Sequence, residues 1–357
     1  MNRISFFILF FITLLFVITS VFLITNESSD KYKIDSRKLA FPKLSKNINN
    51  VKKIEIVFKN ENFSIEYKNK NWVVLEKESY TVPRKKVRDF LVELSSLKLI
   101  EKKTSKFNRY KRLHLDSPNN ESSESRKIKL ISNDGEILAH ALIGKRKYFL
   151  YVDGRGGTYI RKINEKQSWL SEGEVNFSGI DTDWLDKLIF DFDPNDVMQY
   201  KIIYPDLSEL TAYRNRPGQK FKLNNFKNEI EFRTDNELER LSFVIDKFEF
   251  ADIEKFPFNN LITNSVSKHI ASYTFFDGLK ITFEVFTMEK KADSSKFDDP
   301  PRWAKVYASI SSLATLEQRN RLGSIVNDLN KKMSPWEFLL DELDSMRTTK
   351  QLKDMIK

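Results

Sequence analysis

The chain has 357 residues, of which 40% are hydrophobic and 31% charged, a composition that suits a folded protein with room for two ordinary domains. It contains no cysteine, which excludes a disulfide framework, thiol chemistry, cysteine-ligated zinc and a lipid-modified N-terminal cysteine. The formal net charge of +10 is spread over 60 basic and 50 acidic residues, with no basic stripe interleaved with aromatic residues. We therefore expect no nucleic-acid partner.

The first element is an uncharged apolar run of 22 residues, Ile4–Thr25. At about 1.5 Å per residue, a helix of this length spans about 33 Å, which is enough for a hydrocarbon core of about 30 Å. The run is longer than the apolar core of a cleaved signal peptide, and no small-residue cleavage site follows it. We therefore predict an uncleaved transmembrane helix within residues 1–26, through which the protein contacts the membrane.

The flanking charges leave two orientations open. Arg3 precedes the run, whereas Lys31, Lys33, Arg37 and Lys38 follow it, which opposes the positive-inside rule. That rule weakens when a long domain is translocated. We predict a single-pass protein of the inner (cytoplasmic) membrane, with a short cytoplasmic N-terminus and the bulk of the chain in the periplasm. The alternative is a cytoplasmic body tethered to the membrane.

A first folded unit is expected after a polar linker over residues 27–46. Alternating apolar residues predict a strand over Val51–Phe58, and Phe63–Leu75 predicts a second and a third strand with a bend in between. Thr81 and Pro83 are expected to open a helix, because proline suits the first turn of a helix. Its apolar side chains keep helical spacing: Val87, Phe90, Leu91, Leu94 and Leu97.

The same order of elements recurs 146 residues later, where Val197–Tyr204 aligns with Val51–Phe58. A second helical pattern follows, carried by Leu238, Leu241, Ile245 and Phe248. Further along, the strand pairs around Asp134-Gly135 and Asp277-Gly278 correspond. Asp-Gly between alternating strands is typical of a hairpin, because both residues tolerate the positive φ that a type I′ turn requires. We expect each aspartate to turn the chain and not to act in catalysis.

These patterns predict an α+β fold, in which an N-terminal transmembrane helix is followed by two tandem duplicated domains. Each domain is expected to be an antiparallel sheet with a packed helix. The first repeat is placed at 47–192 and the second at 193–357, which also carries C-terminal elements. Those elements are a strand at Arg302–Ile310, a helix from Thr315, an extended segment at Pro335–Leu340 and a closing helix over Ser345–Lys357.

Several features together carry a resemblance to a known family. They are the N-terminal anchor, the strand pair leading to Trp72, the helix after Tyr80–Val87, the hairpin Ile128–Lys145 and the aromatic strand Gly157–Ile163. This arrangement resembles the bacterial membrane-anchored domain of unknown function catalogued as four-three-four-zero, often encoded beside gliding-type ABC-transporter auxiliary proteins. The resemblance implies a protein partner in an ABC-type transport or cell-envelope complex, and it implies no catalytic residues.

Residues that could carry chemistry are scattered along the chain. His114, His140 and His269 lack the spacing of a helical zinc pair, and no G-x-S-x-G nucleophile elbow is present. His140 and His269 are expected to be ordinary sheet residues. The glycine-rich stretch Tyr151–Ile160 lacks the order of a phosphate-binding loop, so we expect a hairpin loop there. No catalytic residue, cofactor or metal ligand is therefore predicted.

One acidic run, Asp191–Asp196, resembles the start of a calcium-binding loop. Asp191, Asp193 and Asn195 mimic the first ligands of a calcium loop, but Asp196 stands where glycine is needed and Ile202 where glutamate closes the loop. A solvated interdomain linker is the favoured interpretation. A weak cation site within this run is the alternative.

The segment Phe248–Leu261 is more aromatic than one small helix needs. Core packing is the default explanation, and the alternative is a partner-binding surface around Phe250, Phe256 and Phe258. Our leading hypothesis is a non-enzymatic, membrane-anchored extracytoplasmic module that binds or scaffolds a transport or envelope complex. The alternatives are an extracytoplasmic hydrolase or carbohydrate-acting enzyme that uses paired carboxylates, and a structural tether.

Overall fold

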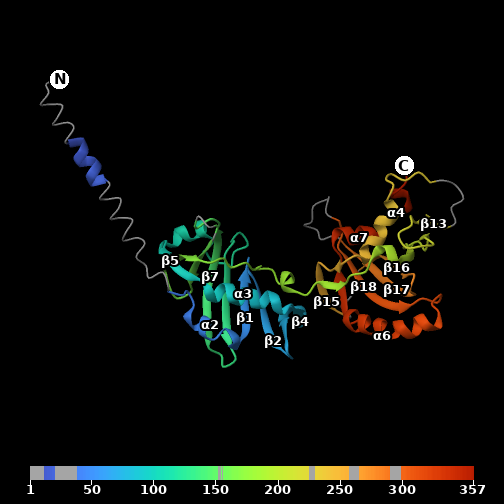
Figure 1. Cartoon of the computed structure of the whole chain (residues 1–357), viewed down its shortest axis with the longest axis horizontal. Helices are drawn as coiled ribbons and strands as arrows, with labels where there is room; N and C mark the ends of the chain where they lie inside the picture. Colours follow the sequence, from blue (N-terminus) through green and yellow to red (C-terminus); the bar gives the residue numbers. More distant parts are fainter. Residues whose placement is uncertain are drawn as a thin grey trace, which may run out of the picture. The chain divides into compact units, whose positions relative to one another are not determined.

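The computed structural model describes residues 12–20, 38–151, 154, 156–224, 230–256, 265–289 and 299–357. The chain divides into two compact units, Met1–Leu185 and Asp186–Lys357 (Figure 1). Both units are α+β, with more sheet than helix, as the sequence predicts. Every strand pair within the described residues is antiparallel.

In the described part of unit 1, nine strands form one sheet in the order β4-β3-β2-β1-β6-β7-β8-β9-β5. The strands are β1 (Val51–Phe58), β2 (Glu61–Lys68), β3 (Asn71–Val74), β4 (Tyr80–Val82), β5 (Lys98–Lys102), β6 (Arg126–Ser132), β7 (Ile137–Lys147), β8 (Gly157–Lys162) and β9 (Ser168–Glu172). The α-helices are α2 (Pro42–Lys46) and α3 (Arg84–Ser96), and the 3₁₀ helices are η1 (Ile48–Asn50), η2 (Leu75–Lys77), η3 (Phe107–Leu113) and η4 (Thr182–Trp184).

In the described part of unit 2, eight strands form a sheet in the order β13-β12-β11-β16-β17-β18-β19-β15, and β10 pairs with β14 separately. The strands are β10 (Leu188–Phe190), β11 (Val197–Ile203), β12 (Glu209–Tyr213), β13 (Lys222–Leu223), β14 (Phe248–Glu249), β15 (Asp252–Lys255), β16 (Ser265–Phe275), β17 (Leu279–Met288), β18 (Arg302–Ile310) and β19 (Trp336–Leu339). The helices are η5 (Pro194–Asp196), α4 (Glu237–Leu241), η6 (Ser242–Ile245), α6 (Leu316–Met333), α7 (Glu342–Thr349) and η7 (Leu352–Asp354).

The two large sheets share one strand order. Read from one edge, β3-β2-β1-β6-β7-β8-β9-β5 corresponds to β13-β12-β11-β16-β17-β18-β19-β15, and unit 1 adds β4 at its edge. The hairpins β6–β7 and β16–β17 both turn at the predicted Asp-Gly pairs, with φ of 85° at Gly135 and 92° at Gly278. Asp134 accepts the Glu136 N–H at 3.2 Å, and Asp277 accepts the Leu279 N–H at 2.9 Å. The expected turn role of both aspartates is confirmed, but the turns are not of the expected type I′, because only the glycine of each pair has a positive φ.

Helix α3 covers the inner face of the sheet in unit 1. It begins at Arg84, after Pro83 and later than expected, because Thr81 belongs to strand β4. The predicted apolar positions Val87, Phe90, Leu91 and Leu94 are buried. Each such side chain contributes about 1.5–3 kcal/mol when it is removed from water. Fully buried aliphatic side chains of the sheet complete this core: Ile54, Ile56, Ile65, Ile128 and Leu130.

The inner face of unit 2 is aromatic. Rings of Phe248, Phe283 and Phe338 pack edge to face, with centroids 5.1 Å and 6.0 Å from that of Phe248. Helix α6 lies against β18 (Figure 1), because Asn330 exchanges two hydrogen bonds with the backbone of Ala308, at 2.8 and 2.9 Å. This helix begins at Thr315 as predicted, with a capping box.

The second predicted helix is shorter than expected, and its prediction beyond Ile245 is wrong. Helix α4 ends at Leu241, and η6 follows over Ser242–Ile245. Lys247 then adopts a left-handed φ of 52°, which ends the helical path. Phe248 therefore enters strand β14, where it pairs with Phe190.

Two further boundaries differ from expectation. The closing helix α7 begins at Glu342, because Asp341 caps it by accepting the Asp344 N–H at 2.7 Å, and it ends at Thr349. Strand β5 was not predicted, because it follows α3 with a single residue between them. It forms the edge of the sheet beside β9.

The expected anchor Ile4–Thr25 lies mostly outside the described residues. Residues 12–20 form a helix, and within the described ranges no helix is long and apolar enough to cross a membrane. The expected linker over 27–46 ends earlier than predicted, because Leu39 forms a bridge with Lys98. Three side chains that follow are buried in unit 1: Ala40, Phe41 and Leu44.

Candidate functional site

The three histidines lie in different local settings. His114 ends η3 with a left-handed φ of 54°. His140 lies in β7 and His269 in β16, so both are sheet residues as expected. Burial, with the nearby Lys127 and Lys129, lowers the pKa of His140, and burial with Arg302 lowers the pKa of His269. Among the described residues, no three His, Asp or Glu side chains are grouped as metal ligands.

The acidic run at Asp191–Asp196 has a structural use. The Asp193 side chain accepts the Asn195 N–H at 2.8 Å and so begins η5. The guanidinium of Arg214 donates to the backbone carbonyls of Pro194 and Val197. The run therefore fixes the start of β11, the first strand of the large sheet in unit 2.

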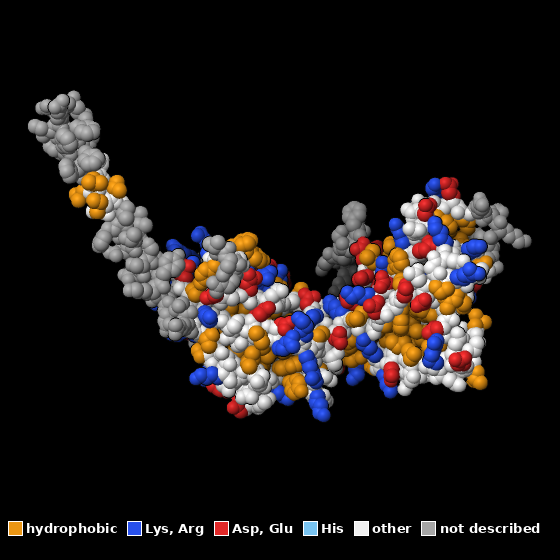
Figure 2. Space-filling model, viewed as in Figure 1, with side chains coloured by type: hydrophobic (Ala, Val, Ile, Leu, Met, Phe, Trp, Pro, Cys, Tyr) orange, Lys and Arg blue, Asp and Glu red, His pale blue; other side chains and the backbone are white. Residues whose placement is uncertain are grey.

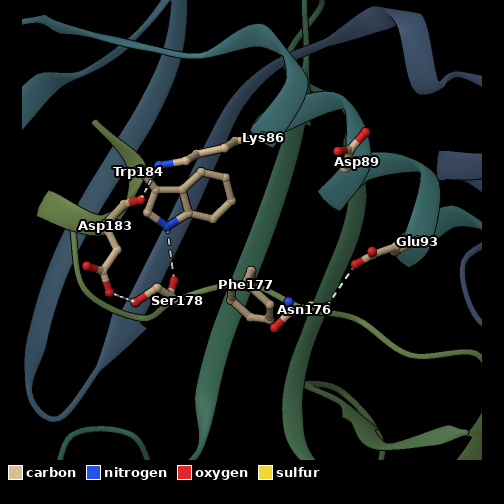
Figure 3. Close-up of a pocket in the computed structure, with 8 residues that line it drawn as sticks. All are labelled: Lys86, Asp89, Glu93, Asn176, Phe177, Ser178, Asp183 and Trp184. Atoms are coloured by element: carbon tan, nitrogen blue, oxygen red, sulfur yellow. Dashed lines mark hydrogen bonds between the residues drawn. The ribbon is translucent and has the colours of Figure 1, made fainter. Parts of the chain in front are cut away.

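A cleft in unit 1 gathers three acidic side chains beside α3 (Figure 3). It has a volume of about 300 Å³ and lies between α3 and the segment Asn176–Trp184. Neighbouring carboxylates are what a hydrolase with paired acidic residues requires. The lining residues are Lys86, Asp89, Glu93, Asn176, Phe177, Ser178, Asp183 and Trp184.

Each acidic side chain of this cleft holds a structural partner. Glu93 accepts the Asn176 N–H at 2.8 Å, and Asp183 accepts the Ser178 hydroxyl at 2.7 Å (Figure 3). A hydrogen bond from Lys85 holds the pKa of Asp89 below its usual value. A general acid needs a raised pKa to keep its proton at neutral pH. The arrangement at Asp89 is the opposite of the one that acid catalysis requires.

The remaining contacts show what the cleft does. Lys86 donates to the carbonyls of Asp183 and Leu185, and the Trp184 indole N–H donates to the Ser178 carbonyl at 3.0 Å. The Trp184 ring meets Phe90 edge to face at 5.5 Å. Polar and aromatic contacts thus hold the last segment of unit 1, residues 176–185, against α3.

The outer face of the unit 2 sheet is the second candidate site. In register across β11, β16, β17 and β18, one row runs Lys201, Ser272, Thr282 and Tyr307, and the next runs Gln199, Thr274, Lys280 and Ser309. Except for the buried Thr282, these side chains are partly exposed. We call Gln199, Lys201, Ser272, Thr274, Lys280, Tyr307 and Ser309 the open face. All of them except Tyr307 line a hollow of about 380 Å³.

The alternation of β17 produces the open face. Leu279, Ile281 and Phe283 are buried on the inner side, whereas Lys280 and Glu284 alternate with them on the outer side. Sequence reasoning located this strand but missed the surface, although strict apolar/polar alternation is the signal for a sheet with one solvated face. The open face offers hydroxyl, amide and ammonium groups on a rigid sheet, which suits recognition.

The three phenylalanines predicted for a partner surface lie in different environments. Phe250 is 1% exposed and packs against Phe338 at 5.5 Å, so it is a core residue and the prediction of a surface position is wrong. Phe256 is 39% exposed, and the Lys305 ammonium lies 4.0 Å above its ring. Phe258 lies outside the described residues.

Charges of both signs are mixed on the visible surface of the two units (Figure 2). A family model described as "Domain of unknown function (DUF4340)" matches residues 72–268, which is more than half of the chain. The matched range begins in β3 of unit 1 and ends in β16 of unit 2. No curated protein and no solved structure matches the chain.

Proposed function

The chain belongs to the DUF4340 family, and on that premise we propose that it is a non-enzymatic, membrane-anchored binding module of an ABC-type transport or cell-envelope complex. In this proposal Ile4–Thr25 crosses the inner membrane once, and both units lie in the periplasm. The uncharged apolar run of 22 residues supports the anchor. The shared strand order supports an origin of the two units by duplication.

The observation that carries the proposal is the open face of unit 2. Its polar side chains stand on strands that are hydrogen-bonded on both sides, so they keep a fixed spacing. Tyr307 supplies an aromatic ring with a hydroxyl, a side chain enriched at the centre of protein interfaces. Burial beside Glu284 raises the pKa of Tyr307, so the phenol remains protonated and donates to the Glu284 carboxylate at 3.5 Å.

The border of the open face adds an apolar contact. Phe256 is half-exposed beneath Lys305, and a cation over an aromatic ring is a contact that a partner can extend. Lys305 supplies a positive charge beside this ring, and Lys280 supplies another on the open face, so we infer a protein partner with an acidic, hydrogen-bonding surface. The membrane anchor would hold the open face near such a partner and raise its local concentration.

Site-specific photo-crosslinking in native membranes tests the proposal. A photoreactive residue at Tyr307 of the full chain should capture a membrane or envelope protein. The matched control is Leu316, which is 75% exposed on α6 of the same unit. Capture of the same protein at both positions, or of none at Tyr307, would contradict a role for the open face. Phe256→Ala at equal expression should reduce the capture several-fold.

Orientation needs its own measurement. Alkaline phosphatase fused to the C-terminus is active only in the periplasm, so we expect an active fusion in a Gram-negative host. A cytoplasmic reporter at the same place should stay inactive. The reverse result would place both units in the cytoplasm and would contradict the proposed orientation.

A further inference from the structure

The chain enters unit 1 at one end of its sheet, and a hairpin loop leaves the sheet at the same end. Leu39 forms a bridge with Lys98 at the start of β5. The ladder then continues across three strands in register, from Lys98 to Glu172, from Glu172 to Gly157 and from Gly157 to Lys147. The connection after Lys147, between β7 and β8, therefore lies at the end of the sheet where the N-terminal segment arrives.

This connection combines exposed aromatic rings with basic side chains. Tyr148 is 59% exposed, Phe149 81% and Tyr151 38%. Lys145 and Lys147 are also exposed, and the guanidinium of Arg146 lies over the Tyr148 ring at 5.2 Å. We call Lys145–Tyr151 the aromatic tip. Three exposed rings in seven residues leave a large apolar area in contact with water, which is unfavourable unless another surface covers it.

The backbone conformation of the aromatic tip also indicates a function. Phe149 has a φ of 55°, in the left-handed region that glycine and asparagine occupy with least cost. A bulky aromatic residue is strained in this region, and strain of this kind concentrates at positions with a function. Since the Phe149 ring is 81% exposed, packing within unit 1 does not account for it.

We propose that the aromatic tip inserts into the headgroup layer of the membrane that holds the anchor, with anionic lipid phosphates as ligands of its basic side chains. This inference rests on the proposed anchor. Tyrosine and phenylalanine beside lysine and arginine have the chemistry of an interfacial segment, because the rings enter the acyl boundary while the cations meet phosphates.

The length of the intervening chain permits this contact. Thirteen residues separate Thr25 from Leu39, and at most about 3.5 Å per residue they reach about 45 Å. The opposite end of the sheet carries the turn at Asp134-Gly135. Strand β7 has 11 residues, so Ile137 and Lys147 lie about 33 Å apart. The two ends of the sheet are thus far enough apart for a reporter at one end to be distinguished from a reporter at the other.

Single labelled cysteines test the proposal in the full chain, which has no native cysteine. An environment-sensitive dye is placed at Tyr151→Cys, which keeps Tyr148 and Phe149. The matched control is Ile137→Cys, because Ile137 is 46% exposed at the far end of β7. In vesicles of phosphatidylethanolamine and phosphatidylglycerol, we expect a blue shift and quenching by lipid-borne quenchers at position 151, and neither at 137.

Flotation of the same vesicles separates failure of the anchor from failure of the tip. A chain that floats while both dyes report water overturns the tip and leaves the proposed function intact. A chain that does not float overturns the anchor, and this inference with it. A shift at position 151 that persists without lipid would assign the tip to a second copy of the chain. An equal shift in phosphatidylcholine vesicles or high salt would overturn the role of the basic residues.

Phe149→Asn in the reporter chain distinguishes a lipid contact from a structural role. Asparagine tolerates positive φ, so the melting temperature of unit 1 should stay equal or rise, while the dye at position 151 loses its shift. A lower melting temperature would show that the ring stabilises the fold and would overturn the proposal. A dye shift that survives this change would do the same.

Discussion

Equivalent faces of the two sheets have different neighbours. In unit 1, η3 and the residues around it lie over the outer face of β7 and β8, where Tyr110, Leu115 and Leu142 form a separate buried cluster. In unit 2, the outer face of β17 and β18 is the open face. The connection after β5 has 23 residues, against nine after β15. One sheet plan thus gives a covered outer layer in unit 1 and a partly exposed polar surface in unit 2.

The strands themselves encode this difference. On the outer side of β7, Leu142 and Gly144 are buried, and a Cβ at Gly144 would meet the Leu113 carbonyl oxygen at 2.1 Å. Only glycine allows the covering segment to approach this closely. The outer side of β17 carries Lys280 and Glu284, which are suited to water.

The largest expected effect comes from removing the centre of the covering segment. Tyr110 is 3% exposed, its hydroxyl donates to the Lys166 carbonyl at 2.5 Å, and the Arg161 guanidinium lies 4.5 Å from its ring. We expect Tyr110→Ala to reduce the unfolding free energy of unit 1 by about 3–5 kcal/mol, as for other buried aromatic residues. The matched change on the open face, Tyr307→Ala, should cost about 1 kcal/mol or less.

Urea unfolding followed by pulse proteolysis measures both changes, because fragments can be assigned to each unit. Equal losses for Tyr110→Ala and Tyr307→Ala would show that the open face is as tightly covered as the outer face of unit 1. A loss in unit 2 caused by Tyr110→Ala would contradict the separation of the two cores.

The duplicated turn gives the next largest contrast. A Cβ at Gly135 would meet nothing within 4 Å, whereas a Cβ at Gly278 would lie 2.7 Å from the Ala314 Cβ. Both positions have positive φ, so Gly135→Ala should cost about 1 kcal/mol from backbone strain alone. Gly278→Ala adds overpacking against the segment that leads into α6, for a total of about 2–4 kcal/mol. Equal losses of unfolding free energy for the two changes would mean that the segment around Ala314 moves aside without cost and that the overpacking argument is wrong.

Much of the fold was predictable because its signals are local. The Asp-Gly turns, Pro83 before α3 and the capping box at Thr315 each act within a few residues. The outer cover was not predictable from its own sequence, since the segment between β5 and β6 is polar and without periodicity. A usable signal lay in the partner strand: Leu138–Gly144 is nearly continuous in apolar residues, as in strands buried on both faces, whereas Leu279–Val285 alternates.

The candidate sites were less predictable than the fold. The cleft of Figure 3 joins residues of α3 to a segment about ninety positions later, and no local pattern links the two. Phe250 and Phe256 look alike in sequence, but Phe250 precedes β15 and points into the aromatic core, while Phe256 follows it and remains half-exposed. Which phenylalanine is exposed depends on tertiary packing.

The smallest expected difference between the two units is in the pH dependence of their stability. Leu130 in unit 1 occupies the register position that Tyr273 holds in unit 2, and in unit 2 the buried Asp344 of α7 lies near that tyrosine. Burial, together with Asp341, raises the pKa of Asp344 to about 6, although Arg347 donates to it at 2.8 Å. The folded unit thus binds this proton more tightly than the unfolded chain does.

Stability from this proton is complete below the unfolded pKa, near 4, and is lost as the pH rises through about 6. We expect unit 2 to lose about 1–3 kcal/mol across this window, and Asp344→Asn to abolish the loss. Unit 1 provides an internal control, because Lys53 and Lys129 hold the pKa of Glu55 below its usual value despite partial burial, which makes its contribution rise with pH. Pulse proteolysis at several pH values should therefore show that Asp344→Asn removes a falling contribution from the stability of unit 2 and leaves unit 1 unchanged. The lowered pKa of His269 adds a rising contribution to unit 2 in both chains, so the comparison is between the chains with and without Asp344. Identical pH profiles of unit 2 in the two chains would show that Asp344 does not carry this effect.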